Sequence, residues 1–399
     1  MPVGLRSPSR EALAPDATYT PPPSAPDAPV RTELSAAEHA PSGRDLVVIG
    51  LTTLAVRIAL FVAATQIAGW SLTTFANLHD GPSYLRVAAG MLDPSAVVAH
   101  IDRRVFIGYP TLIALLGLAG VPLTIAALGV SWLSSGAAAV LSALLFRDRR
   151  IGWAMAIVPP SFLTYSTLAM SEASLLALVA VGMYCVVRRD ALVAGALALG
   201  FAGLVRPVAC FAVLALLAAF AYRRQWRKAI VVALITAAVV AVGFGSLRVW
   251  RGDALEGVKI YANNKHTFGG QLLAWPFESL IMTPLRSSVP LWKIGYVWAY
   301  VAAVCGGCLL AVRALRRPAS ARARDESLVA AVWLIANTLF VLSMGSVWGF
   351  HYFDRHILAA LPPLLWAYQV YYPRRIGVWV VSGALSASLG LSGLLASVV

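Results

Sequence analysis

The chain has 399 residues, of which 59% are hydrophobic and only 13% are charged, and its mean hydropathy is +0.75. One globular core cannot bury that much apolar surface, which excludes an ordinary soluble protein, and several apolar blocks reach about 20 residues, enough to cross a bilayer as a helix. The net charge of +14 does not indicate a nucleic-acid partner, because the basic residues form short strings between apolar blocks. We therefore expect an all-α polytopic membrane protein that binds no nucleic acid.

Residues 1–44 differ from the rest of the chain. They are rich in Pro, Ala and Ser, without an apolar period and without a cleavable hydrophobic segment. Since such a composition cannot bury enough apolar surface to fold, we expect a disordered cytoplasmic tail, followed by a transmembrane domain over 45–399.

Five basic strings divide the transmembrane domain, at 147–150, 188–189, 223–228, 313–324 and 374–375. If all five are cytoplasmic, as the charge rule for membrane proteins prefers, an even number of spans separates each pair. This parity predicts about eleven spans, at 45–68, 121–146, 151–169, 173–187, 191–222 (two short helices), 229–249, 291–312, 328–346, 357–372 and 376–397. The two short helices of 191–222 are expected to meet outside at Arg206 and Pro207, because proline removes a backbone donor.

Two long loops then lie outside, at 69–120 and 250–290. The first is too long for a simple connection, and we expect it to carry amphipathic helices on the bilayer surface. Its apolar stretch 107–119 must lie along or partly within the outer leaflet, because a full crossing would put the next basic string outside. The amino terminus is predicted to be cytoplasmic.

The cysteines do not indicate a redox or metal site. Cys185, Cys210, Cys305 and Cys308 all lie in apolar stretches. Although the last two have C-x-x-C spacing, no His or further Cys stands at ligand spacing, so packed thiols are expected.

This topology gathers most residues capable of chemistry on the outer side. They are His79, Asp80, His100, Asp102, Arg103, Arg104, Glu172, Arg206, Lys265, His266, His351, Asp354, Arg355 and His356. Because Lys and Arg alone set the topology, the gathering of acids and histidines is partly independent information. It predicts an extracytoplasmic active site in the cell membrane.

Asp80 is the catalytic candidate in the first outer loop. A carboxylate at the membrane surface, followed one helical turn later by Tyr84, suits a membrane transferase that activates a hydroxyl. The alternative is a helix cap, since Asp-Gly-Pro before an apolar pattern also begins a helix. A capping carboxylate can still act as a base, because helix amides and burial both change its pKa.

Arginines in these loops are candidates for binding phosphate. Arg103 and Arg104 offer planar donors to a lipid-linked phosphate, or simply attract anionic lipid. Glu172 and Arg206 each interrupt an apolar hairpin at its outer tip, where an ionisable residue indicates function, although the two could also simply pair. Arg57 lies deep in the first span, and the sequence assigns it no role.

A compact cluster enters the tenth span. Asp354, Arg355 and His356 stand near Trp348, His351 and Tyr352, a combination that suits a phosphosugar; the alternative for Trp348 and Tyr352 is an interfacial aromatic belt. Lys265 and His266, in the second outer loop, are weaker candidates for binding substrate.

Four short motifs occur in order within roughly residues 45–225. They are HDGPSY over 79–84, VFIGYP over 105–110, MSEA over 170–173 and LVRP over 204–207. They resemble the W-D-x-x-x-Y, F-x-P-L-Y-P, Y-x-E-A and L-x-R-P elements of the GT-C superfamily of polytopic glycosyltransferases, nearest to its PIG-V-like mannosyltransferases. His79 replaces the usual Trp, and the second element is degenerate. Residues 355–365 resemble the closing segment of several GT-C groups.

The resemblance implies an inverting transferase that moves a hexose, mannose in this family, from a polyprenyl-phosphate donor to a lipid, glycan or protein acceptor. Asp80 corresponds to the catalytic base of the family. No cofactor is expected, and a divalent metal requirement is left open. The rival interpretations are a lipid or solute transporter, including a flippase, and a non-catalytic membrane scaffold.

Overall fold

The structure is a computed structural model that describes residues 39–396, apart from 94, 97, 264–272, 287, 319 and 374. Within these residues the chain is helical, and its one β-bridge joins Leu273 to Met344. Most of the predicted tail, residues 1–38, lies outside the described residues. The predicted all-α fold is confirmed.

The helices of the amino-terminal half are α2 (Gly43–Ala68), α3 (Leu72–Ala76), α4 (Gly81–Leu92), η1 (His100–Arg104), α5 (Gly108–Leu118), α6 (Leu123–Phe146), α7 (Arg149–Ile157), α8 (Pro160–Thr167), α9 (Glu172–Arg189), α10 (Leu192–Val205), η2 (Pro207–Ala209) and α11 (Cys210–Tyr222). Those of the other half are α12 (Trp226–Arg251), α13 (Glu256–Asn263), α14 (Glu278–Arg286), α15 (Leu291–Arg316), α16 (Ala321–Leu342), α17 (Ser346–His351), α18 (Phe353–Ile357), η3 (Leu358–Ala360), α19 (Leu361–Ala367), η4 (Gln369–Tyr371) and α20 (Ile376–Ala396).

Six helices in the described part of the chain are long and apolar enough to span a membrane: α2, α6, α12, α15, α16 and α20. The pair α8 and α9, bent by 108°, passes the same test as one broken span, and α5, α10 and α11 are shorter apolar helices. The predicted break at Arg206 and Pro207 is confirmed. The total of eleven spans stays a prediction.

Two spans predicted as continuous helices are wrong in detail, and proline is the reason. The chain over 151–169 forms α7 and α8, separated at Val158 and Pro159, and 357–372 forms η3, α19 and η4 around Pro362 and Pro363. A proline removes a backbone donor and crowds the preceding turn, so a helix ends near it.

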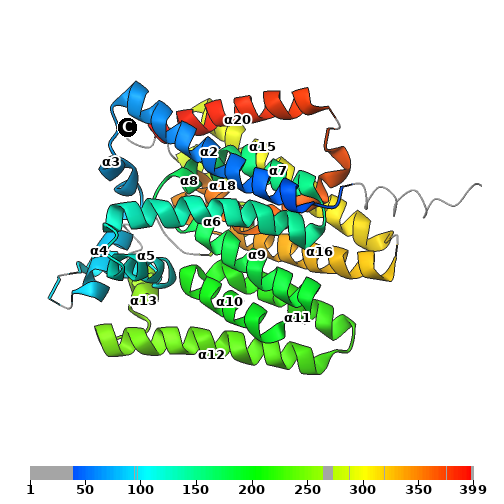
Figure 1. Cartoon of the computed structure of the whole chain (residues 1–399), viewed down its shortest axis with the longest axis horizontal. Coiled ribbons are helices and arrows are strands. Elements are labelled where there is room, and N and C mark those ends of the chain that lie inside the picture. The colour runs from blue at the N-terminus through cyan, green and yellow to red at the C-terminus, as the bar shows by residue number, and fades with distance from the viewer. Residues whose placement is uncertain are drawn as a thin grey trace, which may run out of the picture. The chain divides into compact units, whose positions relative to one another are not determined.

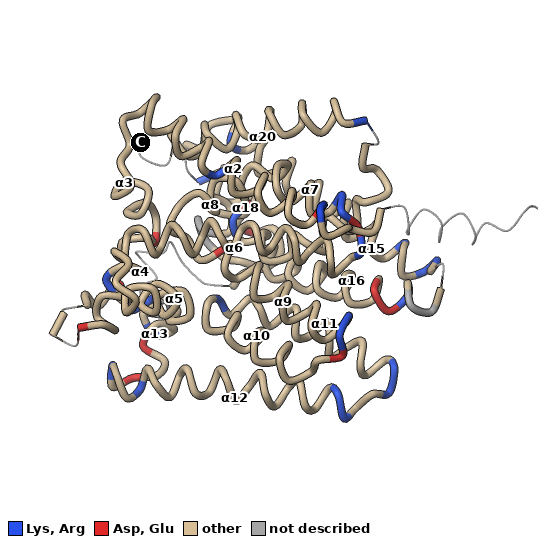
Figure 2. Tube along the Cα trace, in the orientation of Figure 1, with Lys and Arg blue, Asp and Glu red and all other residues tan. Residues whose placement is uncertain are grey.

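Lys and Arg gather at one end of the bundle, at the right of Figure 2. There α6 and α9 end, α11 turns into α12, α15 turns into α16, and α20 begins (Figures 1 and 2). The short helices α3, α4, α5 and α13 lie at the opposite end. The basic strings therefore share one side, as the parity argument requires; that this side is cytoplasmic stays a prediction.

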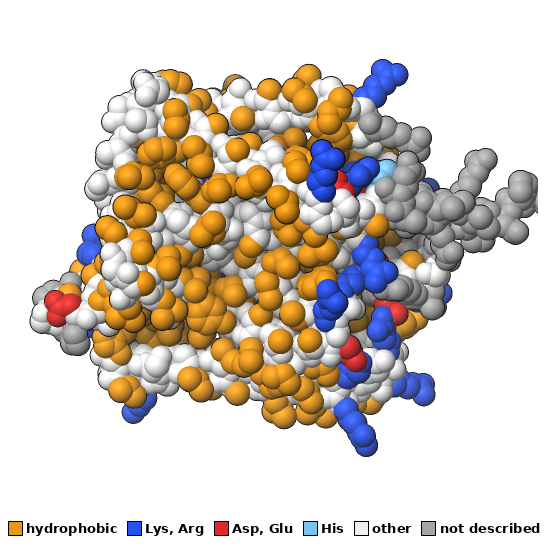
Figure 3. All heavy atoms as spheres, in the orientation of Figure 1, with side chains coloured by type: hydrophobic (Ala, Val, Ile, Leu, Met, Phe, Trp, Pro, Cys, Tyr) orange, Lys and Arg blue, Asp and Glu red, His pale blue; other side chains and the backbone are white. Residues whose placement is uncertain are grey.

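Between the two ends, hydrophobic side chains cover the face of the molecule drawn in Figure 3. On α12, for example, Leu234 is 65% exposed and Val242 is 72% exposed. A protein with apolar side chains exposed over whole helices would aggregate in water, whereas the same surface is stable in contact with lipid.

Arg57, which the sequence left without a role, is fully buried in α2 and fastens it to the broken span. Its Nε donates to Ser166 Oγ at 2.9 Å, and its Nη1 donates to the carbonyls of Ala156 at 2.7 Å and Thr53 at 3.3 Å. The carbonyl of Ala156 has no helical partner because the residue four positions later, Pro160, lacks an N–H. Arg57 replaces that missing donor.

Arg57→Lys is expected to lower the free energy of unfolding by about 1–3 kcal/mol, because the charge stays buried while a single ammonium cannot reach all three acceptors. Thermal unfolding in detergent measures this loss. The control is Arg44→Lys, at an exposed position near the start of the same helix. Equal unfolding midpoints in the two variants would contradict the proposed role.

Candidate active site

Asp80 lies in the turn before α4, at the N-cap position, with φ −85° and ψ −3°. Its side chain makes no capping hydrogen bond. Instead, Oδ1 accepts a hydrogen bond from Arg104 at 3.0 Å, and Oδ2 accepts one from Arg355 at 2.7 Å. The interpretation of this carboxylate as a helix cap is therefore wrong.

The backbone on both sides of Asp80 is tightly constrained. His79 has φ 52°, in the left-handed region that few residues other than glycine adopt. At Gly81, a Cβ atom would lie 2.1 Å from the carbonyl oxygen of Ala76. The turn therefore accepts glycine alone at position 81, and it directs the Asp80 carboxylate away from its own helix.

Asp80 is part of a continuous row of charges, which we call the ionic chain: Arg104, Asp80, Arg355, Glu172 and Arg206. Arg355 bonds Asp80 through Nη2 and Glu172 Oε1 through Nε, and Arg206 Nη1 donates to the same Glu172 oxygen. The members come from η1, the turn before α4, α18, the start of α9 and the end of α10. Three guanidiniums meet two carboxylates, so the row carries one excess positive charge.

The middle of the ionic chain is buried and its other members are partly open. The side chains of Glu172 and Arg355 are 2% and 7% exposed, whereas those of Arg104, Arg206 and Asp80 are 16%, 18% and 24% exposed. The guanidinium of Arg355 also lies over the ring of Tyr165, 5.5 Å from its centroid, which is within the distance of a cation–π contact. A ligand therefore meets Asp80, Arg104 and Arg206 first.

A narrow pocket adjoins the buried carboxylate. It is lined by Glu172, Leu175, Arg206, Val208, Arg355, His356, Leu358 and Ala359. Glu172 Oε2 is buried and has no hydrogen-bond partner among the described residues. Its volume of about 10 Å³ admits a group no larger than a water molecule, next to two guanidiniums, an imidazole and this oxygen.

Opposing effects set the protonation of the site. Burial raises the pKa of Asp80, but the charges of Arg355 and Arg104 lower it by more, so the pKa lies well below its ordinary value. Burial and the charge of Arg355 lower the pKa of His79. Burial, with Arg206 and Arg355, lowers the pKa of His356 much further. At neutral pH an ionised Asp80 thus stands beside neutral imidazoles.

The predicted pair Arg103 and Arg104 is divided between two contacts. Only Arg104 reaches Asp80, whereas Arg103 bonds Glu256 Oε1 at 3.2 Å. His100 Nδ1 lies 3.4 Å from the same Glu256 oxygen. The two arginines thus bond different carboxylates here, and their joint binding of one phosphate stays a prediction.

Asp102 lies outside the ionic chain and supports it. The buried carboxylate accepts hydrogen bonds from Ser83 at 2.7 Å and from Arg86 at 2.6 and 2.8 Å. The hydrogen bond from Arg86 lowers the pKa of Asp102, with a smaller contribution from Ser83. Asp102 therefore fixes η1, and with it Arg104, against α4.

Other predicted site residues take different positions. Tyr84 is buried and its hydroxyl shares a hydrogen bond of 2.9 Å with Ser171 Oγ, next to Glu172. Asp354 accepts from Tyr296 Oη at 3.0 Å rather than from a guanidinium, and burial raises its pKa. His351 packs edge-on against Phe350. Lys265 and His266 lie outside the described residues, as does the side chain of Trp348.

Three contributing residues were missed from the sequence: Tyr165 beneath Arg355, Ser171 bonded to Tyr84, and Tyr296 bonded to Asp354. Ser171 could have been found, because it stands within the MSEA motif. Tyr165 and Tyr296 carry no signal of their own in an apolar sequence. Among the described residues, no group of three or more His, Cys, Asp and Glu could hold a metal ion.

The helical arrangement is similar to that of a solved structure. The structure of ArnT from Cupriavidus metallidurans bound to undecaprenyl phosphate superposes with a TM-score of 0.52 and 17% sequence identity. The match covers 83% of this chain and 63% of ArnT, so the chain spans less than two thirds of that protein. At this identity the likeness shows a shared fold.

The archaeal oligosaccharyltransferase AglB from Archaeoglobus fulgidus, in complex with an inhibitory peptide and a dolichol-phosphate, is also similar. Its TM-score is 0.48 at 13% identity, over 88% of this chain and 55% of AglB. No protein-family model and no curated protein sequence matches the chain.

Gly81→Ala is expected to destabilise the protein by about 1–3 kcal/mol, because the added methyl group overlaps the Ala76 carbonyl and the turn must shift. The matched control is Gly129→Ala in α6, where a Cβ meets nothing within 4 Å. Thermal unfolding of both variants in detergent tests this, and a Gly81→Ala midpoint as high as the control would refute the constraint.

Proposed function

We propose that the protein is a membrane glycosyltransferase that moves a hexose, mannose in the first instance, from a polyprenyl-phosphate donor to a hydroxyl of a lipid, glycan or protein acceptor. The reaction takes place on the extracytoplasmic face. The observation that carries this proposal is the ionic chain, in which a partly open carboxylate lies between two arginines that can bind phosphate.

The charge of the ionic chain suits a donor whose leaving group is a phosphate. Guanidinium groups bind phosphate oxygens through paired N–H donors, and the row already holds one cation more than it has anions. Arg206 and Arg104 are the more exposed cations of the row; Arg206 bonds Glu172, and Arg104 bonds Asp80. They are the groups that a lipid phosphate would meet on entering.

The chemistry is a single displacement. Asp80 takes the proton of the acceptor hydroxyl while the hydroxyl oxygen attacks the anomeric carbon of the sugar. The bond between that carbon and the phosphate oxygen breaks, and its electron pair stays on the phosphate. The polyprenyl phosphate leaves as an anion next to the arginines, and one displacement inverts the anomeric centre. General-base assistance of this kind is worth about 10²- to 10⁴-fold in rate.

The resting site holds its base in an inactive condition. Both oxygens of Asp80 are bonded to arginines, and its lowered pKa makes it a weak proton acceptor. A donor phosphate competes for the same guanidiniums, and each contact that moves from Asp80 to the phosphate raises the basicity of the carboxylate. Donor binding thereby prepares the acceptor step.

The shared fold supports this class of substrate. ArnT, which has this helical arrangement, was crystallised with undecaprenyl phosphate. A transporter or flippase is less well supported, because such proteins place polar groups for their substrate near the bilayer midplane. Arg57 is a charge at that depth, and its hydrogen bonds go to Ser166 and backbone carbonyls.

Asp80→Asn is expected to lower transfer by at least about 10²-fold while leaving the fold intact, because the amide cannot accept the proton. The assay incubates purified protein with labelled polyprenyl-phosphate-mannose and a membrane lipid extract, and measures labelled product together with released polyprenyl phosphate. The control is Asp93→Asn, an exposed carboxylate at the other end of α4. Near-normal turnover by Asp80→Asn removes this residue from the role.

The pH profiles of kcat/KM and of kcat should differ on their acidic side. In the free enzyme the arginines keep the pKa of Asp80 low, so kcat/KM stays flat as the pH falls through the ordinary Asp range near 3.9. In the donor complex the phosphate shares those arginines, so the pKa rises and the limb of kcat moves to higher pH. Coincident limbs in the wild-type enzyme would contradict competition between phosphate and Asp80.

A further inference from the structure

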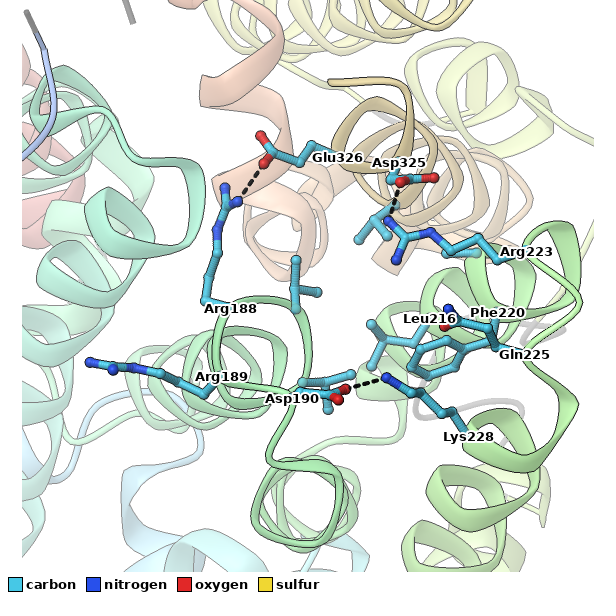
Figure 4. Close-up of a pocket in the computed structure, with 14 residues that line it drawn as sticks. Arg188, Arg189, Asp190, Leu216, Phe220, Arg223, Gln225, Lys228, Asp325 and Glu326 are labelled. Atoms are coloured by element: carbon cyan, nitrogen blue, oxygen red, sulfur yellow. Dashed lines mark hydrogen bonds and ion pairs between the residues drawn. The ribbon is translucent and has the colours of Figure 1, made fainter. Parts of the chain in front are cut away.

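A second cavity lies at the end of the bundle that carries the basic strings. It holds about 400 Å³ and is formed where α9 ends, α11 turns into α12, and α16 begins (Figure 4). This volume is within the range of small-molecule sites in proteins. We call it the corner pocket.

Charged and apolar walls meet in the corner pocket. Three ion pairs line it, Arg188 with Glu326, Arg223 with Asp325, and Lys228 with Asp190, as the dashed lines of Figure 4 show. The apolar part of the lining comes from Val186, Val187, Leu216, Ala219, Phe220 and Val329. A ligand that fits both walls is amphipathic, with a charged head and an apolar tail.

Two buried polar atoms in this lining have no hydrogen-bond partner among the described residues. They are a donor, Arg188 Nη2, and an acceptor, Gln225 Oε1. The Arg188 side chain is 5% exposed and is held in place by bonds from Nε to the Leu145 carbonyl at 2.6 Å and from Nη1 to Glu326. Buried guanidinium N–H groups are ordinarily hydrogen-bonded, so this edge would gain a strong hydrogen bond from an anionic oxygen that reached it.

The surroundings place the corner pocket at a membrane surface. Tyr222 and Trp226, at the α11–α12 corner, are 58% and 59% exposed, and aromatic residues of this kind are enriched at headgroup level. A second hollow, lined by residues 224–228, adjoins them and shares Gln225 and Lys228 with the corner pocket. Lipid headgroups are thus the nearest source of an amphipathic phosphate.

We propose that the corner pocket binds the headgroup of a membrane phospholipid. A phosphate oxygen accepts from Arg188 Nη2, a headgroup hydroxyl or ammonium donates to Gln225 Oε1, and an acyl chain lies along Leu216 and Phe220. The site is separate from the ionic chain, because Glu172 and Arg188 stand about 24 Å apart along α9. The proposal does not depend on transferase activity.

The test measures binding of a short-chain phosphatidylglycerol and a short-chain phosphatidylethanolamine to the delipidated protein in detergent, by calorimetry. Arg188→Gln is expected to weaken binding of at least one of these lipids by about tenfold or more, since a charge-assisted hydrogen bond is lost. Arg189→Gln is the matched control, because this neighbouring side chain also borders the pocket but is exposed, bonds Tyr184 and points away from the interior (Figure 4).

A second variant, Glu326→Gln, is expected to change lipid affinity in the opposite direction. It removes the anion that competes for Arg188, so lipid affinity should increase, whereas a merely structural ion pair predicts no gain. Inorganic phosphate and glycerol phosphate test the source of the anion, and both should bind more weakly than the lipid. The proposal is overturned by equal lipid affinity in Arg188→Gln and Arg189→Gln, by unchanged or weaker binding in Glu326→Gln, or by free phosphate binding as tightly as lipid.

Discussion

The candidate site depends on the need to pair one buried guanidinium, that of Arg355. An isolated charge in the interior costs several kcal/mol, and removing one partner from a buried pair typically costs about 3–5 kcal/mol. Arg355 meets this need with two carboxylates, Asp80 and Glu172, which lie 275 and 183 residues away in the chain. These bonds connect α4, α9 and α18, so the electrostatic requirement of one side chain determines how three distant elements meet.

Helix ends explain why the charges collect at one level. Glu172 is the first residue of α9, Arg206 is the C-cap of α10, and Asp80 is the N-cap of α4. A bilayer accepts a broken helix only where protein or trapped water satisfies the freed backbone groups, so breaks and polar side chains occupy the same protected positions. Arg57, bonded to the carbonyl that Pro160 leaves free, follows the same rule.

Hydropathy and charge patterns were sufficient for the all-α membrane class, for the common end of the basic strings and for the break at Arg206, because these follow from local composition. Side-chain partners were not predictable. Arg103 and Arg104 are adjacent, yet they bond Glu256 and Asp80, at separations of 153 and 24 residues. Such contacts depend on how remote helices pack, and that packing cannot be predicted from a single apolar sequence.

The ionic chain links folding to the proposed chemistry. In the proposed reaction a donor phosphate would replace the Asp80 carboxylate as the anion bonded to Arg104 and Arg355, so these guanidiniums would stay paired while Asp80 is released. This exchange avoids the cost of leaving a buried cation alone. The same contacts that hold the resting site together would therefore keep Asp80 a weak base until a donor is bound. In a site without donor, Asp80 would then not deprotonate an acceptor hydroxyl.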